Sequence, residues 1–244
     1  MEARGLAKRF GGVEAVRGVD LAVRRGEVAA LIGPNGAGKT TCFNLLTGQL
    51  RPDAGRVWLR GRDVTGRPPH DLARLGVGRT FQVTAAFASM TVRENVQVAC
   101  LARHRRLTGL VRPAAGRFAA EADALLERVG MADQAGRACG VLAYGDLKRV
   151  ELAVALAHEP DLLLMDEPTA GLAPPERHAL MALVSALVAD RGLTVLFTEH
   201  DMDVVFGHAA RVLVMHRGEI IADGPPDVVR ADPRVQAVYL GGGT

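Results

Sequence analysis

The chain has 244 residues, of which 48% are hydrophobic and 23% are charged. This composition supplies a large apolar core and excludes a disordered or fibrous chain. Apolar runs such as Val28–Ile32 are far shorter than the ~20 residues of a membrane-spanning helix. The first residues show no apolar segment behind a basic leader, so no secretory signal is expected either.

The charge pattern argues against a nucleic-acid partner. The formal net charge is +3, and all but three of the 30 basic residues are arginines. Most arginines are interspersed with acidic residues, which is more typical of a compositional bias than of a nucleic-acid-binding surface. The three cysteines lie far apart, without the paired spacing of a metal or redox site. We therefore expect a cytoplasmic protein with reduced thiols.

The N-terminal part combines predicted strands, glycine turns and one helix. Residues 6–23 carry alternating apolar residues between glycines, which predicts short antiparallel strands, and residues 57–59 extend them. Val28–Ile32 is a short apolar run closed by glycine and proline, as in a buried strand. A glycine-rich loop over residues 35–38 leads into a predicted helix, Lys39–Leu46.

The middle of the chain is predicted to be helical. Thr91 and Glu94 form a capping-box pattern that opens a helix towards Leu107. Residues 118–129 place apolar side chains on one helical face and stop at a glycine. Residues 146–158 form a third predicted helix, which a proline ends.

From residue 161 onwards, predicted strands and helices alternate. Strands are expected over residues 162–165, 194–198 and 212–216, and helices over residues 175–189 and up to Phe206. This alternation predicts a mostly parallel sheet covered on both faces. The predicted fold class is therefore α/β, in one domain over residues 1–244. Its core, with an N-terminal antiparallel β-subdomain, comprises residues 1–83 and 159–244, and residues 84–158 form an inserted helical subdomain.

Residues 33–40 fit the pattern G-x-x-x-x-G-K-[ST] of a P-loop NTPase, between a predicted strand and a predicted helix. Glycines let the backbone N–H groups face phosphate oxygens, and the helix N-terminus adds its positive dipole end. This chain's residue frequencies give roughly 0.002 chance matches. Lys39 is predicted to reach the β- and γ-phosphates of ATP, and Thr40 to bind Mg²⁺. The predicted nucleotide-binding residues are Gly33, Pro34, Asn35, Gly36, Ala37, Gly38, Lys39, Thr40 and Thr41.

An acidic pair follows the predicted strand over residues 162–165. A carboxylate at the end of a buried strand lies at the C-terminal edge of the sheet, where ligands bind in open α/β folds. Asp166 is predicted to hold Mg²⁺, directly or through water, and Glu167 to polarise the attacking water. Such a pair is also a common helix N-cap, but the phosphate loop favours the catalytic interpretation.

Two further motifs accompany the phosphate loop and the acidic pair. Residues 142–146 read Leu-Ala-Tyr-Gly-Asp, twenty positions (166 − 146) before Asp166, and Glu199-His200 follows the next predicted strand. In this order the four motifs resemble the ATP-binding subunits of ABC transporters, over essentially the whole chain. The resemblance implies ATP hydrolysis at sites formed between two such subunits, with ATP and Mg²⁺ as cofactors.

The resemblance also implies roles for single residues. Phe10 is similar to the aromatic side chain that stacks on adenine. Gln82 resembles the glutamine that links Mg²⁺ and the attacking water to the helical insertion, and His200 resembles the histidine that contacts the γ-phosphate. Residues 170–173 match the loop that crosses the interface between the two subunits.

The signature motif departs from the family's usual Leu-Ser-Gly-Gly-Gln. Ala143 lacks the serine hydroxyl that would contact the partner's γ-phosphate, and Tyr144 and Asp146 replace a glycine and the glutamine. Gly145 and a helix that we expect to begin at Asp146, as its N-cap, still offer N–H groups to an anion. These four residues are predicted to bind nucleotide. The departure from the usual motif is expected to alter the rate of ATP hydrolysis rather than the reaction itself.

Several short motifs resemble one subgroup, the ATP-binding subunits of bacterial branched-chain amino-acid importers. They are Tyr144-Gly145, the sequence Gly-Arg-Thr-Phe-Gln over residues 78–82, residues 170–174, and Val-Tyr-Leu-Gly over residues 238–241. The resemblance implies integral-membrane permease subunits and a second ATP-binding subunit, identical or homologous, as partners. A periplasmic or extracellular solute-binding protein would be an indirect partner. The implied location is peripheral, at the cytoplasmic face of the inner membrane.

Other functions remain open at this stage. Importers of urea, short amides or another polar solute have similar ATP-binding subunits. A soluble ABC ATPase acting on nucleic acid or ribosomes is less favoured, because such proteins usually carry two cassettes or a long insertion. The function of a P-loop motor or helicase would not explain the motifs at residues 142–146 and at His200.

One stretch of the predicted helical insertion is free of acidic residues. Between Glu94 and Glu121 the chain carries five arginines and no aspartate or glutamate. One hypothesis is that Arg103, Arg105 and Arg106 face anionic lipid headgroups or acidic permease loops. The alternative is an ordinary solvated face.

Overall fold

In the computed structural model, which describes residues 1–80, 86–104 and 118–240, a six-stranded sheet forms the centre of the molecule. Its strand order is β10-β9-β3-β8-β7-β6, parallel from β9 to β6, with β10 antiparallel at one edge. This confirms the predicted mostly parallel sheet. Its strands are β3 (Val28–Ile32), β6 (Val77–Thr80), β7 (Leu162–Asp166), β8 (Thr194–Thr198), β9 (Arg211–His216) and β10 (Glu219–Gly224).

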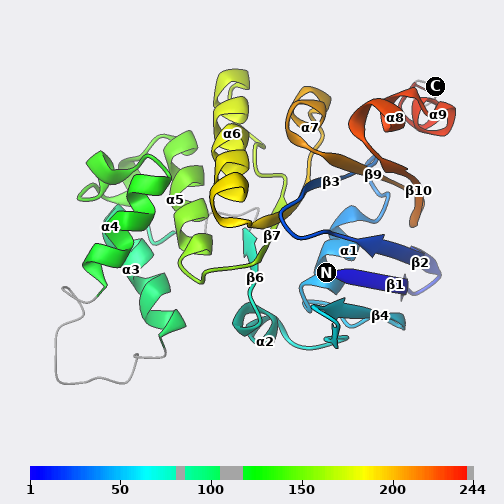
Figure 1. Ribbon diagram of the computed structural model, residues 1–244, viewed down its shortest axis with the longest axis horizontal. Coiled ribbons are helices and arrows are strands. Elements are labelled where there is room, and N and C mark those ends of the chain that lie inside the picture. The colour runs from blue at the N-terminus through cyan, green and yellow to red at the C-terminus, as the bar shows by residue number, and fades with distance from the viewer. Residues whose placement is uncertain (81–85, 105–117, 241–244) are drawn as a thin grey trace.

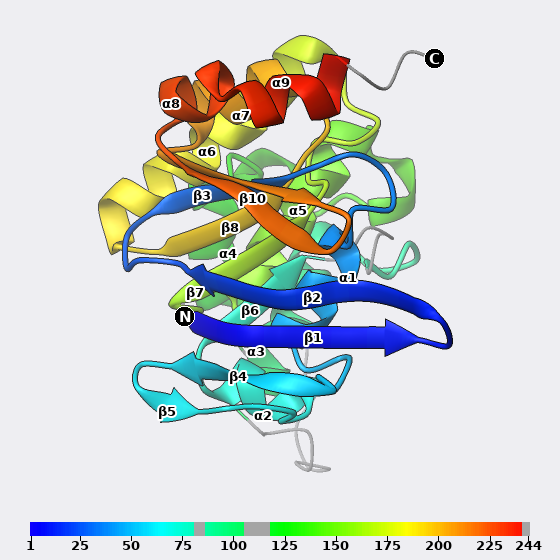
Figure 2. The same ribbon diagram turned by 90° about the vertical axis from the view of Figure 1, so that its right-hand side faces the viewer.

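A second, antiparallel sheet comes from the N-terminal part of the chain and lies beside the first (Figure 2). Its order is β2-β1-β4-β5, from β1 (Glu2–Phe10), β2 (Val13–Ala22), β4 (Ala54–Leu59) and β5 (Arg62–Asp63). The antiparallel prediction is confirmed, but β1 begins at Glu2 rather than near residue 6. Register shifts between β1 and β2 interrupt the two-residue alternation on which the prediction relied.

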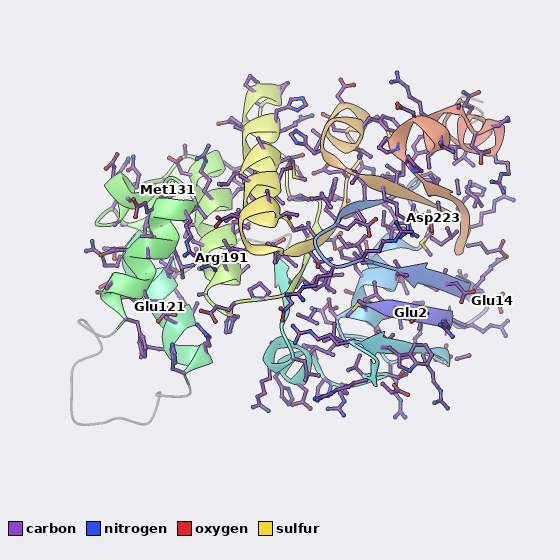
Figure 3. The ribbon with its side chains drawn as sticks, viewed as in Figure 1. Glu2, Glu14, Glu121, Met131, Arg191 and Asp223 are labelled. Atoms are coloured by element: carbon purple, nitrogen blue, oxygen red, sulfur yellow. The ribbon has the colours of Figure 1, made fainter. Side chains whose placement is uncertain are left out.

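The helices fall into groups that Figure 1 separates clearly. Helices α3, α4 and α5 lie together at one end, and the antiparallel sheet lies at the other (Figure 1). In Figure 3, Glu121 and Met131 mark the helical end, whereas Glu2 and Glu14 mark the opposite end. None of the helices in the described ranges has the length and hydropathy of a membrane-spanning segment. The helices are α1 (Lys39–Leu46), α2 (Pro69–Arg74), α3 (Val92–Arg103), α4 (Ala119–Arg128), α5 (Tyr144–Leu156), α6 (Pro174–Arg191), α7 (Met202–His208), α8 (Pro226–Ala231) and α9 (Pro233–Leu240).

The six-stranded sheet is buried on both faces. Along β3, Ala29 and Leu31 belong to a core shared with the antiparallel sheet and α1, whereas Ala30 and Ile32 belong to a core shared with helices on the other side. This alternation follows from the two-residue period of a strand. Because both faces are covered, all five residues of β3 are buried and its sequence is continuously apolar.

The predictions for α3 and α5 need correction, and α5 also ends at Leu156 rather than at residue 158. Helix α3 begins with the predicted capping box at Thr91 but ends at Arg103, before residue 107. Helix α5 begins at Tyr144, so Ala143 occupies the N-cap position and the prediction of Asp146 as N-cap is wrong. Asp146 lies in the first turn of α5, where its carboxylate still interacts favourably with the helix dipole.

The ion pairs of Arg103 argue against the hypothesis that its side chain faces lipid headgroups or acidic permease loops. Its guanidinium pairs with Glu121, at 3.2 Å, and with Glu159, both of which lie far from it in the sequence. The charge is therefore matched within the protein. Arg105 and Arg106 lie outside the described residues.

The capping box generates a prediction about stability. The Thr91 hydroxyl accepts a hydrogen bond from the Glu94 N–H at 3.2 Å, and the Glu94 carboxylate accepts one from the Thr91 N–H at 2.7 Å. Replacing Thr91 by Ala leaves the Glu94 N–H without its side-chain acceptor and should lower the free energy of unfolding by about 1 kcal/mol. Urea unfolding without nucleotide measures this, and Thr91→Ser is the control that should unfold like the wild type. Equal loss in both variants would contradict the capping role.

Candidate functional site

The phosphate loop connects the C-terminal end of β3 to the N-terminus of α1. Gly33 and Gly38 have φ angles of 156° and 105°, a region that favours glycine. A Cβ atom would lie 2.1 Å from the Met215 carbonyl oxygen at Gly33, and 2.2 Å from the Ala15 carbonyl oxygen at Gly38. Neither position therefore accepts a side chain, for steric as well as conformational reasons.

Lys39, the first residue of α1, points its buried ammonium back into this loop. Its Nζ atom donates hydrogen bonds to the carbonyl oxygens of Gly33, at 2.6 Å, and Pro34, at 3.2 Å. Burial lowers the pKa of the Lys39 ammonium from its ordinary value, while the charges of Glu167 and Asp166 oppose this shift. A cation thus lies behind the loop, close to two carboxylates.

The loop borders a pocket of about 330 Å³. Glu167 and His200 also line this pocket, as does Ala15 of β2. The fold therefore brings together seven predicted phosphate-loop residues and two predicted catalytic residues that lie more than a hundred positions away in the sequence. The phosphate-loop residues that line the pocket are Asn35, Gly36, Ala37, Gly38, Lys39, Thr40 and Thr41.

Glu167 and His200 form a pair at the edge of this pocket. The His200 Nε2 and Glu167 Oε1 atoms lie 2.8 Å apart. Glu167 adopts a left-handed backbone conformation, with φ at 49°, and its N–H lies 3.1 Å from the Thr198 carbonyl oxygen and 3.0 Å from the Thr198 hydroxyl. A non-glycine residue in this region costs of order 1–3 kcal/mol and is held there by its surroundings.

Asp166 ends β7 and is buried, and it does not line the pocket. Its Oδ1 atom accepts a hydrogen bond from the Thr198 hydroxyl at 2.7 Å, and its Oδ2 atom accepts one from Arg79 Nη2 at 3.2 Å. The donors that sequence analysis assigned to Mg²⁺, the Thr40 hydroxyl and the Asp166 carboxylate, are hard oxygen ligands of the type this ion prefers. In the described residues no group of three or more His, Cys, Asp or Glu side chains could hold a metal ion.

The signature residues lie at the N-terminus of α5, away from the phosphate pocket. Ala143, Gly145 and Asp146 line a separate pocket of about 320 Å³ with residues of α6, and this pocket shares no residue with the first. Ala143 makes no side-chain capping bond, so the first N–H groups of α5 lack that acceptor. The Tyr144 ring lies close to Gly171, where a Cβ atom would come within 3.0 Å of it. Within one chain, the pocket at the signature residues and the pocket at the phosphate loop are thus separate.

Phe10 lines neither pocket, and the same holds for the predicted site residues Gly33, Pro34, Tyr144 and Asp166. Phe10 is the last residue of β1 and is 47% exposed, with Lys8 Nζ 5.8 Å from its ring centroid. It belongs to the same hairpin as Ala15, which does line the phosphate pocket. Gln82 lies outside the described residues.

Two residues at the site escaped the sequence analysis. Thr198, the last residue of β8, contacts both Asp166 and Glu167. Arg79 lies in β6 and bonds Asp166, although an arginine in a buried strand is rare. That rarity is the signal that could have singled out Arg79, whereas a threonine in a strand is ordinary.

Comparison with known proteins agrees with this arrangement. The ABC transporter family profile matches residues 16–170, and a profile described as the branched-chain amino acid ATP-binding cassette transporter matches residues 219–244. The high-affinity branched-chain amino acid transport ATP-binding protein LivG of Salmonella typhimurium is 42% identical over 252 residues, covering 99% of this chain and 97% of LivG.

The chain is also similar to solved structures of ABC transporter cassettes. The ADP conformation of an ATP-binding cassette of an ABC transporter superposes with a TM-score of 0.87 at 34% identity, covering 98% of both chains. A dimeric bacterial ABC transporter cassette reaches a TM-score of 0.76 at 25% identity, covering 92% of this chain and 98% of that one. These likenesses span the phosphate loop, the acidic pair and the signature helix, and they confirm the predicted fold class. The chain belongs to the ABC transporter family, as one of its ATP-hydrolysing, ATP-binding cassettes.

Proposed function

We propose that this cassette powers the import of branched-chain amino acids through separate permease subunits, by binding ATP at the phosphate pocket and hydrolysing it there. The observation that carries the site assignment is the pocket itself, where the phosphate loop faces the Glu167–His200 pair. The solute assignment draws on LivG and on the match over residues 219–244. Urea or short amides are the alternative solutes.

In the proposed mechanism, the phosphate loop holds the β- and γ-phosphates through its backbone N–H groups and the Lys39 ammonium. Thr40, Asp166 and Gln82 would hold Mg²⁺, directly or through water, and its charge offsets that of the phosphates. Glu167 accepts a hydrogen bond from the attacking water and orients it towards the γ-phosphate. His200, whose Nε2 atom lies 2.8 Å from Glu167 Oε1, holds that carboxylate in place before nucleotide binds, and it is the proposed contact of the γ-phosphate once nucleotide is bound.

The proposed site is completed by a second cassette. Because the α5 N-terminus and the phosphate pocket share no residue, the signature helix of one chain would contact nucleotide held by the other. Its N–H groups and helix dipole attract the γ-phosphate, and the Asp146 carboxylate opposes that attraction. Phe10, exposed at the end of β1, is the proposed adenine contact.

The proposed partners follow from the transport function. A second ATP-binding subunit, integral-membrane permease subunits and, indirectly, a solute-binding protein would make up the assembly. The cassette would then lie peripherally at the cytoplasmic face of the membrane. The group α3, α4 and α5, at the end of the molecule away from the antiparallel sheet, is the proposed region of permease contact (Figure 1).

Two substitutions separate binding from hydrolysis. Glu167→Gln should abolish turnover and keep ATP affinity, because the water loses its carboxylate while the phosphate contacts remain. Lys39→Ala should weaken ATP binding, because the ammonium that faces the phosphates is removed. Phosphate release and equilibrium binding of ATP measure the two effects. Near wild-type hydrolysis by the Glu167→Gln protein would rule out the proposed role of Glu167.

A shared site makes hydrolysis depend on protein concentration. We expect the ATPase rate to rise faster than linearly with concentration, because each site needs the signature helix of another chain. Light scattering should show the Glu167→Gln variant shifting towards a dimer with ATP but not with ADP. A linear rate together with a monomer in ATP would contradict the shared site.

The transported solute can be tested in proteoliposomes that contain the permease subunits, the solute-binding protein and ATP inside. Leucine, isoleucine and valine should be taken up, and urea should not. Liposomes carrying the Glu167→Gln cassette are the matched control and should show no ATP-dependent uptake. Uptake of urea in place of leucine would overturn the solute assignment while leaving the ATPase assignment intact.

A further inference from the structure

Arg79 is a nearly buried cation with partners on two separate elements. It lies in β6, and its side chain is 12% exposed. Its Nη2 atom donates to the Asp166 carboxylate at the end of β7, at 3.2 Å. Its Nη1 atom lies 2.7 Å from Asn44 Oδ1, 3.0 Å from Thr47 Oγ1 and 3.0 Å from Gln49 Oε1. One guanidinium thus joins β7 to the C-terminal end of α1.

The end of α1 suits a cation for two reasons. The last carbonyl groups of a helix carry partial negative charge, and Thr47 is the C-cap residue of α1. Thr47 also donates its own hydroxyl hydrogen to the Phe43 carbonyl at 2.8 Å, which leaves its lone pairs free to accept from Arg79. The position of the guanidinium is therefore fixed from the α1 side.

The Asp166 carboxylate is correspondingly fixed from two sides. Thr198 of β8 bonds one oxygen and Arg79 bonds the other, and the Asp166 side chain is only 7% exposed. A carboxylate can rotate about its terminal bond unless both oxygens are held. Because α1 begins at Lys39 in the phosphate loop, the same guanidinium connects the phosphate-binding helix to this carboxylate.

We propose that Arg79 is a positioning residue, which holds the Asp166 carboxylate in the orientation that binds Mg²⁺ and keeps it in register with the phosphate-loop helix. This rests on the proposed function only in taking Asp166 as the Mg²⁺ carboxylate. The planar guanidinium is essential to this role, because its two nitrogens reach β7 and α1 at once. A lysine at this position carries its three N–H donors on a single nitrogen, without the planar fork whose two nitrogens lie toward β7 and α1.

A purely structural ion pair is the competing explanation. In that case, loss of Arg79 lowers stability but leaves the effect of Mg²⁺ on nucleotide binding unchanged. The two explanations therefore differ in one measurable ratio, the affinity for ATP with Mg²⁺ divided by the affinity without it. This ratio is measured at equilibrium with a fluorescent ATP analogue and does not depend on turnover.

We expect Arg79→Ala and Arg79→Lys each to reduce this ratio by about tenfold or more, the usual effect of removing a group that orients a metal ligand. Arg79→Ala opens space towards a pocket of about 240 Å³ that Arg79 lines, so free guanidinium can enter. Guanidinium at concentrations far below denaturing ones should restore the ratio in Arg79→Ala and not in Arg79→Lys. Arg74→Ala, which removes an exposed arginine paired with Asp71, is the matched control and should behave like the wild type.

The outcomes are distinguishable. An unchanged ratio in Arg79→Ala, or a wild-type ratio in Arg79→Lys, overturns the positioning role. If Arg79→Ala does not fold, as thermal unfolding would reveal, Arg79→Lys carries the test alone. Asp166→Asn tests the proposed Mg²⁺-binding role of Asp166 separately from the positioning role of Arg79. If this variant keeps the Mg²⁺ effect, the proposed role of Asp166 fails. If it loses the effect while the Arg79 variants keep it, only the role of Arg79 fails.

Discussion

The close enclosure of the phosphate loop by two backbone carbonyls is the constraint on which the site depends. The Met215 carbonyl of β9 and the Ala15 carbonyl of β2 leave no room for a Cβ atom at Gly33 and Gly38. These carbonyls come from different sheets, so the loop can form only when the two sheets are correctly placed. The inward course of the loop then brings the Lys39 ammonium onto the Gly33 carbonyl. Fold and site are therefore parts of one packing arrangement.

The parts of the fold that local sequence patterns govern were predictable. The apolar run Val28–Ile32, the glycine-rich loop and Lys39–Leu46 form the predicted strand, turn and helix, because each pattern lies within a few neighbouring residues. The order of the motifs then predicted the family and the meeting of the phosphate loop with Glu167 and His200. Parallel strands bring such residues to one edge of a sheet.

Features that depend on distant partners were not predictable. The acids that neutralise Arg103 lie 18 and 56 positions away, and nothing local distinguishes this arginine from a solvated one. Arg79 was visible in the sequence, but its role depends on side chains of α1 and β7. The start of α5 was misplaced because its N-cap, Ala143, is not one of the residues by which N-caps are recognised, whereas Asp146 is.

Thr198, at the end of β8, contacts both residues of the acidic pair. Its hydroxyl donates to the Asp166 carboxylate, and its hydroxyl and carbonyl oxygens both accept from the backbone N–H of Glu167. One threonine at the end of β8 therefore holds the carboxylate of one acidic residue and the backbone of the next. Two residues later, the same chain segment supplies His200, which contacts Glu167. The positions of the acidic pair and of the histidine thus depend on the C-terminal end of one strand, β8. A substitution at residue 198 therefore changes the surroundings of the Asp166 carboxylate and of the Glu167 backbone at once, and a tolerated residue has to satisfy both.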